Sequence, residues 1–152
     1  LDTKVKKLVL PEIPVAAQQF FTSYNASAVE GGRLALSPKN RFSVSGTYMI
    51  PVDESIGRIS FGATFVHTDE MVLSLGTGPQ FQRSPASDLL NLNADWKGIM
   101  GSSVDLSFFM TNVTNEKMIL NISNAWNSFG MESGIVNEPR MYGMRLRYSF
   151  GR

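Results

Sequence analysis

The most regular feature of the chain is an alternation of apolar and polar residues over 142–150. The apolar residues of this segment are Tyr142, Met144, Leu146, Tyr148 and Phe150. Arg145 and Arg147 lie between them, so one face of the segment is apolar and the other carries two guanidinium groups. Successive side chains of a β-strand point to opposite faces of its sheet. The alternation therefore predicts a strand that separates an apolar environment from an aqueous one.

Further segments are expected to form strands for the same reason. Four of them alternate clearly, at 41–50, 58–68, 90–97 and 103–112, and the segment 1–10 does so more weakly. The clear segments have roughly the 9–11 residues that a tilted strand needs to cross a bilayer, whereas soluble strands more often run about 5–6 residues. Helices fit poorly, because β-branched, aromatic and hydroxyl residues dominate and a 3.6-residue period is absent.

The connections between these segments alternate in length. The long connections are 11–40, 70–87 and 114–139, and the short ones are 51–57 and 98–102. Structureless loops beyond about 12–15 residues are uncommon in compact soluble domains. Transmembrane barrels, in contrast, combine short periplasmic turns with long external loops. We therefore predict an all-β fold, an antiparallel up-and-down meander of about six long strands with its long connections outside the cell.

Composition and charge exclude several other classes of protein. The net charge of +1 gives no clustered basic excess, so no nucleic-acid partner is expected. No apolar run reaches the roughly 18 residues of a membrane-spanning helix. Cysteine is absent, which excludes a disulfide framework or a thiolate metal site. The chain begins at Leu1 in a strand-like segment without a signal peptide, and because a barrel protein must be exported, we expect a fragment.

Three motifs point to a particular family. They are SPKNRF at 37–42, FMTNVTNEK at 109–117 and EPRMYGMRLRYSF at 138–150. In this order and spacing they resemble the last strands of TonB-dependent receptors, with their Ala-Pro-Lys-Trp, Asn-Leu-Thr-Asp-Lys and Arg-x-Arg-Tyr-x-Phe patterns, and the resemblance covers essentially the whole chain. The chain departs from the family by continuing past Phe150 to Arg152, and by Arg145 where the barrel-assembly signal often has glycine.

The resemblance implies the C-terminal portion of a 22-stranded transmembrane β-barrel, spanning 1–152, without the plug domain and TonB box. Complete receptors import scarce nutrients such as siderophore-iron, cobalamin or saccharides across the bacterial outer membrane. The implied partners are outer-membrane lipid, the protein's own plug domain, the TonB complex, the barrel-assembly machinery and the small-molecule nutrient. Two alternatives stay open: another outer-membrane barrel such as an autotransporter, and a soluble all-β ligand-binding module. Six strands are too few for the usual self-contained barrel of at least eight.

The two faces of the predicted strands have different expected roles. The apolar residues of 142–150 are expected to face lipid and to form the assembly signal, with a half-buried strand of a soluble sandwich as the alternative. Arg145 and Arg147 are expected to face the lumen. Asp95 and Asp105, on the two preceding strands, would complete a cross-strand charge ladder there. Contact with a plug or an anionic solute is the competing explanation for the arginines.

Aromatic residues of the long connections are candidates for substrate contact, because binding residues concentrate on loops held by a rigid scaffold. These candidates are Phe20, Phe21, Tyr24, Phe81, Trp126 and Phe129. Packing within the loops is the alternative explanation. His67, followed by Asp69 and Glu70, lacks a second histidine or cysteine, so we expect a solvated strand end instead of a metal site. No catalytic set is recognisable, and neither an enzymatic activity nor a cofactor is expected.

Overall fold

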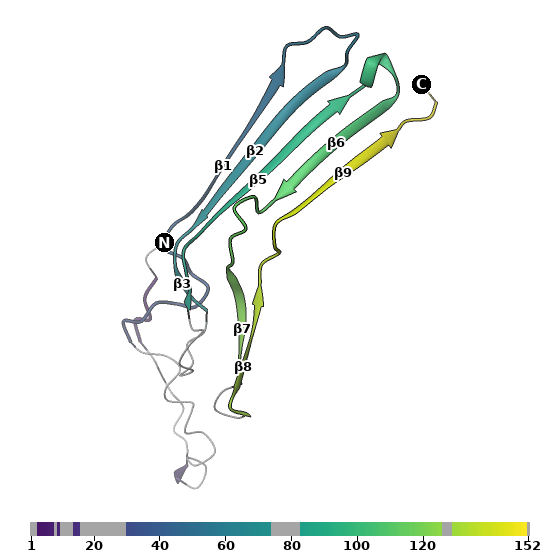
Figure 1. Ribbon diagram of the computed structural model, residues 1–152. Coiled ribbons are helices and arrows are strands. Elements are labelled where there is room, and N and C mark those ends of the chain that lie inside the picture. Colours follow the sequence, from purple (N-terminus) through teal and green to yellow (C-terminus); the bar gives the residue numbers. More distant parts are fainter. Residues whose placement is uncertain are drawn as a thin grey trace. The chain divides into compact units, whose positions relative to one another are not determined.

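The computed structural model contains one five-stranded antiparallel sheet and two small two-stranded sheets (Figure 1). The residues that the structure describes are 3–7, 9, 14–15, 30–73, 83–125 and 129–151. Among them, no helix is long and apolar enough to cross a membrane. The prediction of an all-β fold is confirmed.

The residues divide into two compact units. The sheet unit consists of Phe42–His67, Asp88–Glu116 and Glu138–Arg152. The loop unit consists of Leu1–Arg41, Thr68–Ser87 and Lys117–Asn137. The five-stranded sheet belongs to the sheet unit apart from single residues at the ends of three strands, whereas both two-stranded sheets belong to the loop unit.

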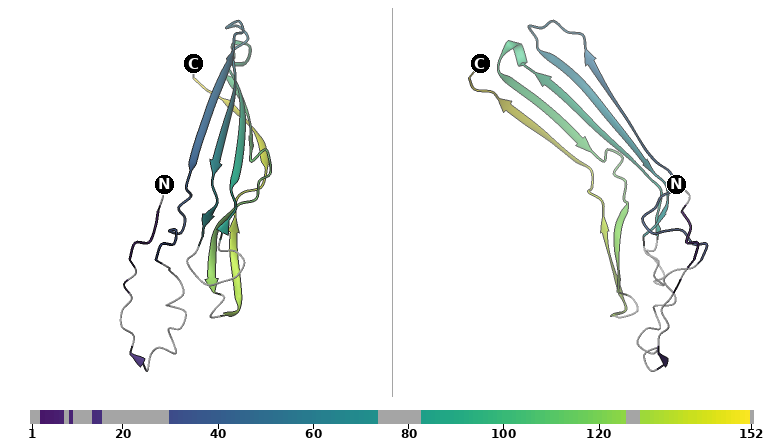
Figure 2. Two further views of the ribbon diagram at one scale, coloured as in Figure 1. Left: turned by 90° about the vertical axis from the view of Figure 1, so that its left-hand side faces the viewer. Right: turned by 180° about the vertical axis from the view of Figure 1, so that it is seen from behind.

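The strands of the large sheet lie side by side in the order in which they occur along the chain, β1-β2-β5-β6-β9 (Figures 1 and 2). Their bounds are β1 Arg41–Ile50, β2 Arg58–Thr68, β5 Ser87–Lys97, β6 Val104–Thr111 and β9 Met141–Tyr148. The predicted meander is therefore confirmed for these strands. The first two have the predicted bounds, and the others differ by one to three residues at an end, where strand assignments commonly vary.

The segment 1–10 is not the sixth strand. Its described residues, 3–7 and 9, have no strand conformation. Val5 instead makes two backbone hydrogen bonds to a distant part of the chain, accepting from the Gly31 amide at 2.8 Å and donating to the Gly32 carbonyl at 2.9 Å. The three lysines at 4, 6 and 7 explain the difference, because they place charge on both faces of this segment and leave no apolar face to hold it on a sheet.

Two of the long connections contain strands that the sequence pattern did not predict. Strands β3 Met71–Val72 and β4 Arg83–Ser84 pair after β2, and β7 Ile119–Ala125 pairs with β8 Met131–Val136 after β6. The β7–β8 register shifts between Ile119 and Asn121. Such an irregularity breaks the period of two, so the alternation that marks the other strands is absent from β7.

The two short turns of the sheet unit pack against each other. The Trp96 indole donates a hydrogen bond from Nε1 to the Ile56 carbonyl at 2.8 Å, and the Met100 amide donates to the same oxygen at 3.1 Å. Gly57 has φ +100°, and a Cβ atom built on it would lie 2.5 Å from the backbone oxygens of Lys97 and Gly98. Only glycine fits at this position, for both reasons.

Replacing Gly57 with alanine is expected to lower the free energy of unfolding by about 3 kcal/mol, because the new methyl group adds a backbone collision to an unfavourable φ. Urea titration of the complete natural protein measures the change. Gly101→Ala is the matched control, since Gly101 has φ +74° but open space around its Cβ position, so it should lose only about 1–2 kcal/mol. Equal losses at the two positions would contradict the close packing of the turns.

The two faces of the sheet as candidate functional site

One face of the five-stranded sheet is apolar across neighbouring strands. Leu106 of β6 lies opposite Trp96 of β5 and Leu146 of β9. Phe108, two residues further along β6, lies opposite Met144 in the same way. Directly opposite residues of paired strands share a face, so these side chains form apolar rows that run across the sheet.

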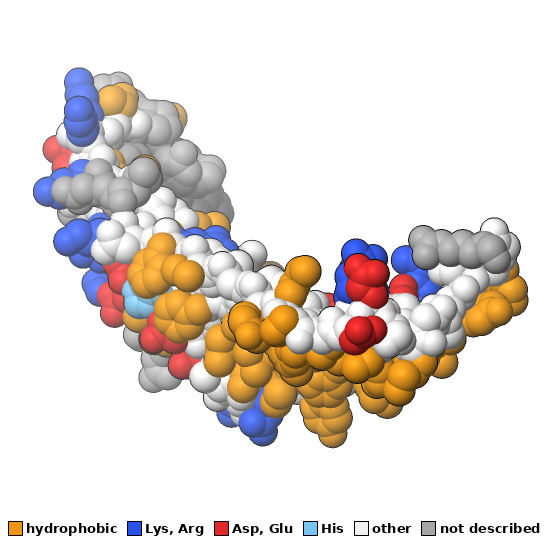
Figure 3. Space-filling view, turned by 90° about the horizontal axis from the view of Figure 1, so that it is seen from above, with side chains coloured by type: hydrophobic (Ala, Val, Ile, Leu, Met, Phe, Trp, Pro, Cys, Tyr) orange, Lys and Arg blue, Asp and Glu red, His pale blue; other side chains and the backbone are white. Residues whose placement is uncertain are grey.

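This apolar face is exposed. Figure 3 shows hydrophobic side chains gathered along one face of the sheet, with only a few charged side chains among them. Exposed fractions on β9 and just beyond it reach 76% for Met144, 72% for Leu146 and 88% for Phe150. Among the residues that the structure describes, the single buried hydrophobic side chain is Leu73, which belongs to the loop unit. The described strands therefore lack the second layer with which a soluble sheet buries its apolar side.

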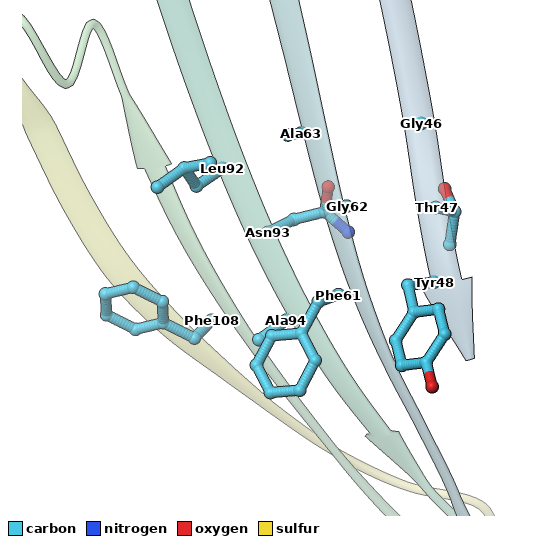
Figure 4. A pocket seen from close by; sticks show the side chains of 10 residues that line it. All are labelled: Gly46, Thr47, Tyr48, Phe61, Gly62, Ala63, Leu92, Asn93, Ala94 and Phe108. Carbon is cyan, nitrogen blue, oxygen red and sulfur yellow. The ribbon is translucent and has the colours of Figure 1, made fainter. Parts of the chain in front are cut away.

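A hollow of about 560 Å³ marks the middle of the apolar face (Figure 4). The rings of Tyr48, Phe61 and Phe108 extend from three strands around it, and Ala63 and Ala94 keep the space between them open. The lining is apolar almost throughout. A hydrocarbon can fill such a hollow without leaving polar groups unsatisfied, whereas a polar ligand would lose its hydrogen bonds to water there.

The opposite face carries hydroxyl, amide and charged side chains. The Ser45 and Thr64 hydroxyls share a hydrogen bond of 3.0 Å between β1 and β2. The Asn93 side chain of β5 covers Gly62 of β2, where a Cβ atom would collide with it. Phe109 is an apolar exception, and its ring covers Gly143 of β9, at 2.7 Å from the position of a Cβ atom. Side chains thus pack laterally over the glycines of this face.

The charged residues of the polar face have the predicted register but not the predicted ion pairs. Asp105 lies opposite Arg147, and Ser107 lies between Asp95 and Arg145. In the part of the chain that the structure describes, neither arginine forms an ion pair with these carboxylates. The charge ladder expected from the sequence is therefore not formed.

The two carboxylates are instead held by neutral donors. Asp105 accepts a hydrogen bond from the Gly98 amide at 2.9 Å. Asp95 accepts from the Ser107 hydroxyl at 2.6 Å and from the Asn93 side-chain amide at 3.0 Å. The backbone amide and the short serine and asparagine side chains that donate these bonds lose little conformational entropy. An exposed arginine, in contrast, must lose side-chain entropy to form an ion pair in water. This difference explains why the register alone did not produce the ladder.

Asn112 connects the end of β6 to the residues that precede β9. Its side chain accepts a hydrogen bond from the Glu116 amide at 2.8 Å and donates to the carbonyls of Glu116 at 2.9 Å and Glu138 at 3.0 Å. The residue is only 5% exposed and has φ +49°. Asparagine tolerates this left-handed conformation better than most residues. The sequence showed Asn112 as part of a motif but did not reveal its contacts.

A histidine–carboxylate pair lies at the end of the sheet where the long connections begin. His67 Nδ1 is 2.6 Å from Asp88 Oδ1, and the Phe42 ring stacks on the imidazole with centroids 5.1 Å apart. His67 lies next to the end of β2, as expected, and its side chain is partly exposed. The sequence did not predict its partner, because Asp88 lies 21 residues away along the chain.

The two acids that follow His67 in the sequence have other partners, in the loop unit. Asp69 accepts hydrogen bonds from the backbone and side-chain amides of Asn40, and Glu70 pairs with Arg83 at 2.7 Å. Among the described residues, no group of three or more histidine, cysteine or acidic side chains could hold a metal ion.

The aromatic candidates for substrate contact fall mostly outside the described residues. Those outside are Phe20, Phe21, Tyr24, Phe81 and Trp126. Phe129 is described, precedes β8 and is 75% exposed. Its contact with a substrate stays a prediction.

Comparison of the chain with protein-family models, with curated proteins and with solved structures finds no match.

Proposed function

We propose that this chain is a wall segment of a TonB-dependent outer-membrane transporter, which imports a scarce nutrient such as siderophore-iron, cobalamin or a saccharide. The observation that carries the proposal is the uncovered apolar face of the five-stranded meander, opposite a face of polar and charged side chains. Exposed apolar patches of this extent mark an interaction with lipid or with another protein. A soluble binding module would have to cover that face with a second layer.

The faces then have separate tasks. The apolar side chains of β1, β2, β5, β6 and β9 contact acyl chains, and Tyr142, Met144, Leu146, Tyr148 and Phe150 also form the signal that the assembly machinery recognises. The polar face, with Asp95, Asp105, Arg145 and Arg147, lines the lumen and faces the plug domain. The short turns lie on the periplasmic side, and the long connections lie outside, where Phe129 is available to a nutrient.

The three sequence motifs favour a TonB-dependent receptor over another outer-membrane barrel such as an autotransporter. A hydrogen bond joins two of these motifs in the structure. Asn112, in the motif at 109–117, donates to the carbonyl of Glu138, which begins the closing motif at 138–150. A bond between the two motifs explains why both would occur together at this spacing. The proposal accordingly includes a location in the bacterial outer membrane and the TonB complex as the energy source.

Nitroxide labels on single-cysteine variants of the complete natural protein in lipid vesicles test the proposal. Labels at Met144 and Leu146 are expected to collide with oxygen, which is concentrated in the hydrocarbon core. Labels at Arg145 and Arg147 are expected to collide with a water-soluble paramagnetic reagent instead. A label at Ser55, in a short turn, serves as the water-exposed control.

The alternation of the two signals along β9 is the decisive result. A water-soluble protein in which Met144 and Leu146 are inaccessible to both reagents would establish the soluble binding module instead. The two accessibility signals could alternate while growth on siderophore-iron, cobalamin and saccharides did not depend on the TonB complex. That combination would indicate another class of outer-membrane barrel.

A further inference from the structure

A second hollow, of about 640 Å³, lies on the polar side of the sheet near the short turns. We call it the turn-end hollow, and its lining includes Arg58, Lys97, Arg147, Asp105, Ser102 and Ser103. Three strands supply its cations: β2 supplies Arg58, β5 supplies Lys97 and β9 supplies Arg147. All of these residues belong to the sheet unit, so the turn-end hollow is formed by one unit alone.

The three cations make no short contacts with carboxylates of the described residues, although Lys97 interacts electrostatically with Asp95 on the same strand. None of them takes part in an ion pair or a side-chain hydrogen bond in that part of the chain. Asp105, the carboxylate nearest to Arg147 in register, is bound by the Gly98 amide instead. Glu54 is the second carboxylate of the lining, so cations outnumber carboxylates three to two.

The donors around the turn-end hollow match a particular chemistry. A guanidinium group presents a planar fork of N–H donors that fits carboxylate or phosphate oxygens in bidentate fashion, and lysine adds a mobile point charge. The Ser102 and Ser103 hydroxyls add neutral hydrogen-bonding groups on the turn side. Three cations and two carboxylates line the same hollow, and this excess of cations without an ion pair among these lining residues favours an anion from outside.

We infer that the turn-end hollow binds a small solute that carries carboxylate or phosphate groups. The inference rests on the proposed function in one respect, since the lumen is the compartment that would bring such a solute to the polar face. It adds a binding site at the turn end of the wall, away from the loops where nutrient contact was expected. Binding needs Arg147 and Lys97 and does not need the cations at the other end of the sheet.

Isothermal titration calorimetry of the complete natural protein in non-ionic detergent tests the inference, with citrate and pyrophosphate as the probes. Both anions are expected to bind, and glucose is expected not to. Arg147→Gln and Lys97→Gln should each weaken binding about 10-fold, because a hydrogen bond to a charged group contributes enough for a factor of that size. Arg147→Lys keeps the charge and should lose less than Arg147→Gln.

Arg41→Gln is the matched control, because Arg41 is an exposed cation at the opposite end of β1. It should leave the affinity unchanged. The inference is overturned if neither anion binds, or if Arg41→Gln weakens binding as much as Arg147→Gln. The accessibility of labels at Met144 and Arg145 does not depend on any anion. If no anion bound, the inference would fail, but the proposed membrane wall would still be decided by the labelling experiment.

Discussion

Phe108→Arg is expected to lower the free energy of unfolding of the complete natural protein in a bilayer by about 2–4 kcal/mol. Phe108 lies in the middle of β6, opposite Ala94 on one side and Met144 on the other, within the apolar rows. If the sheet lies in a membrane as proposed, a guanidinium group at this position would lie among acyl chains near the midplane, where charge is poorly solvated. Urea titration in lipid vesicles measures the change.

Ser107→Arg is the control, because it places the same side chain one residue away on the opposite face. There the new guanidinium group meets Asp95, the hydrogen-bond partner of Ser107, as well as Arg145. In the solvated lumen that the proposed function implies, this attraction and this repulsion largely offset each other. The loss of unfolding free energy should therefore stay below about 1 kcal/mol. Equal losses at Phe108 and Ser107 would show that both faces of the sheet have the same surroundings.

Asn112→Ala is expected to cost about 4 kcal/mol of unfolding free energy. Alanine removes three side-chain hydrogen bonds, each with a net contribution of about 1 kcal/mol, and leaves the groups of Glu116 and Glu138 without these partners. It must also adopt φ +49°, which costs about 1–2 kcal/mol for a residue with a Cβ atom. The measurement is again unfolding in urea.

Two further variants separate these causes. Asn112→Gly relieves the backbone but still lacks the side-chain bonds, so it should lose about 3 kcal/mol. Asn115→Ala changes the same residue type at φ +57°, where the side chain accepts a single bond of 3.3 Å from the Arg140 amide, and it should lose about 2 kcal/mol. If Asn112→Ala proved no worse than Asn115→Ala, the network around Asn112 would have no special part in joining β6 to β9.

These two predictions concern different requirements of the proposed membrane wall. The apolar rows determine whether this face of the sheet is stable against lipid or against water. Phe108→Arg tests this at one position. The Asn112 network determines where a strand leaves the sheet and where the next one enters, because it joins Glu116 and Glu138 across the long connection. A wall needs both, since strands with the right faces must also be held in register.

The sequence determined the faces and most of the strand bounds. β1 and β2 begin and end at the predicted residues, because each carries a clear alternation over most of its length, between turn-forming segments. The alternation is a local property: a period of two decides which face each side chain joins, whatever the neighbouring strand is. For this reason the apolar and polar sides of β9 were also predictable from its residues alone.

Only the tertiary structure decided which groups bind one another. The pairing of His67 with Asp88, the contacts of Asn112 with Glu138, and the neutral partners of Asp95 and Asp105 join residues from different strands and turns. Their choice depends on side-chain direction, on competing donors and on the entropy of long side chains, none of which has a period along the chain. A local pattern can therefore assign each side chain to a face, but the nearest suitable partner in three dimensions determines what it binds there.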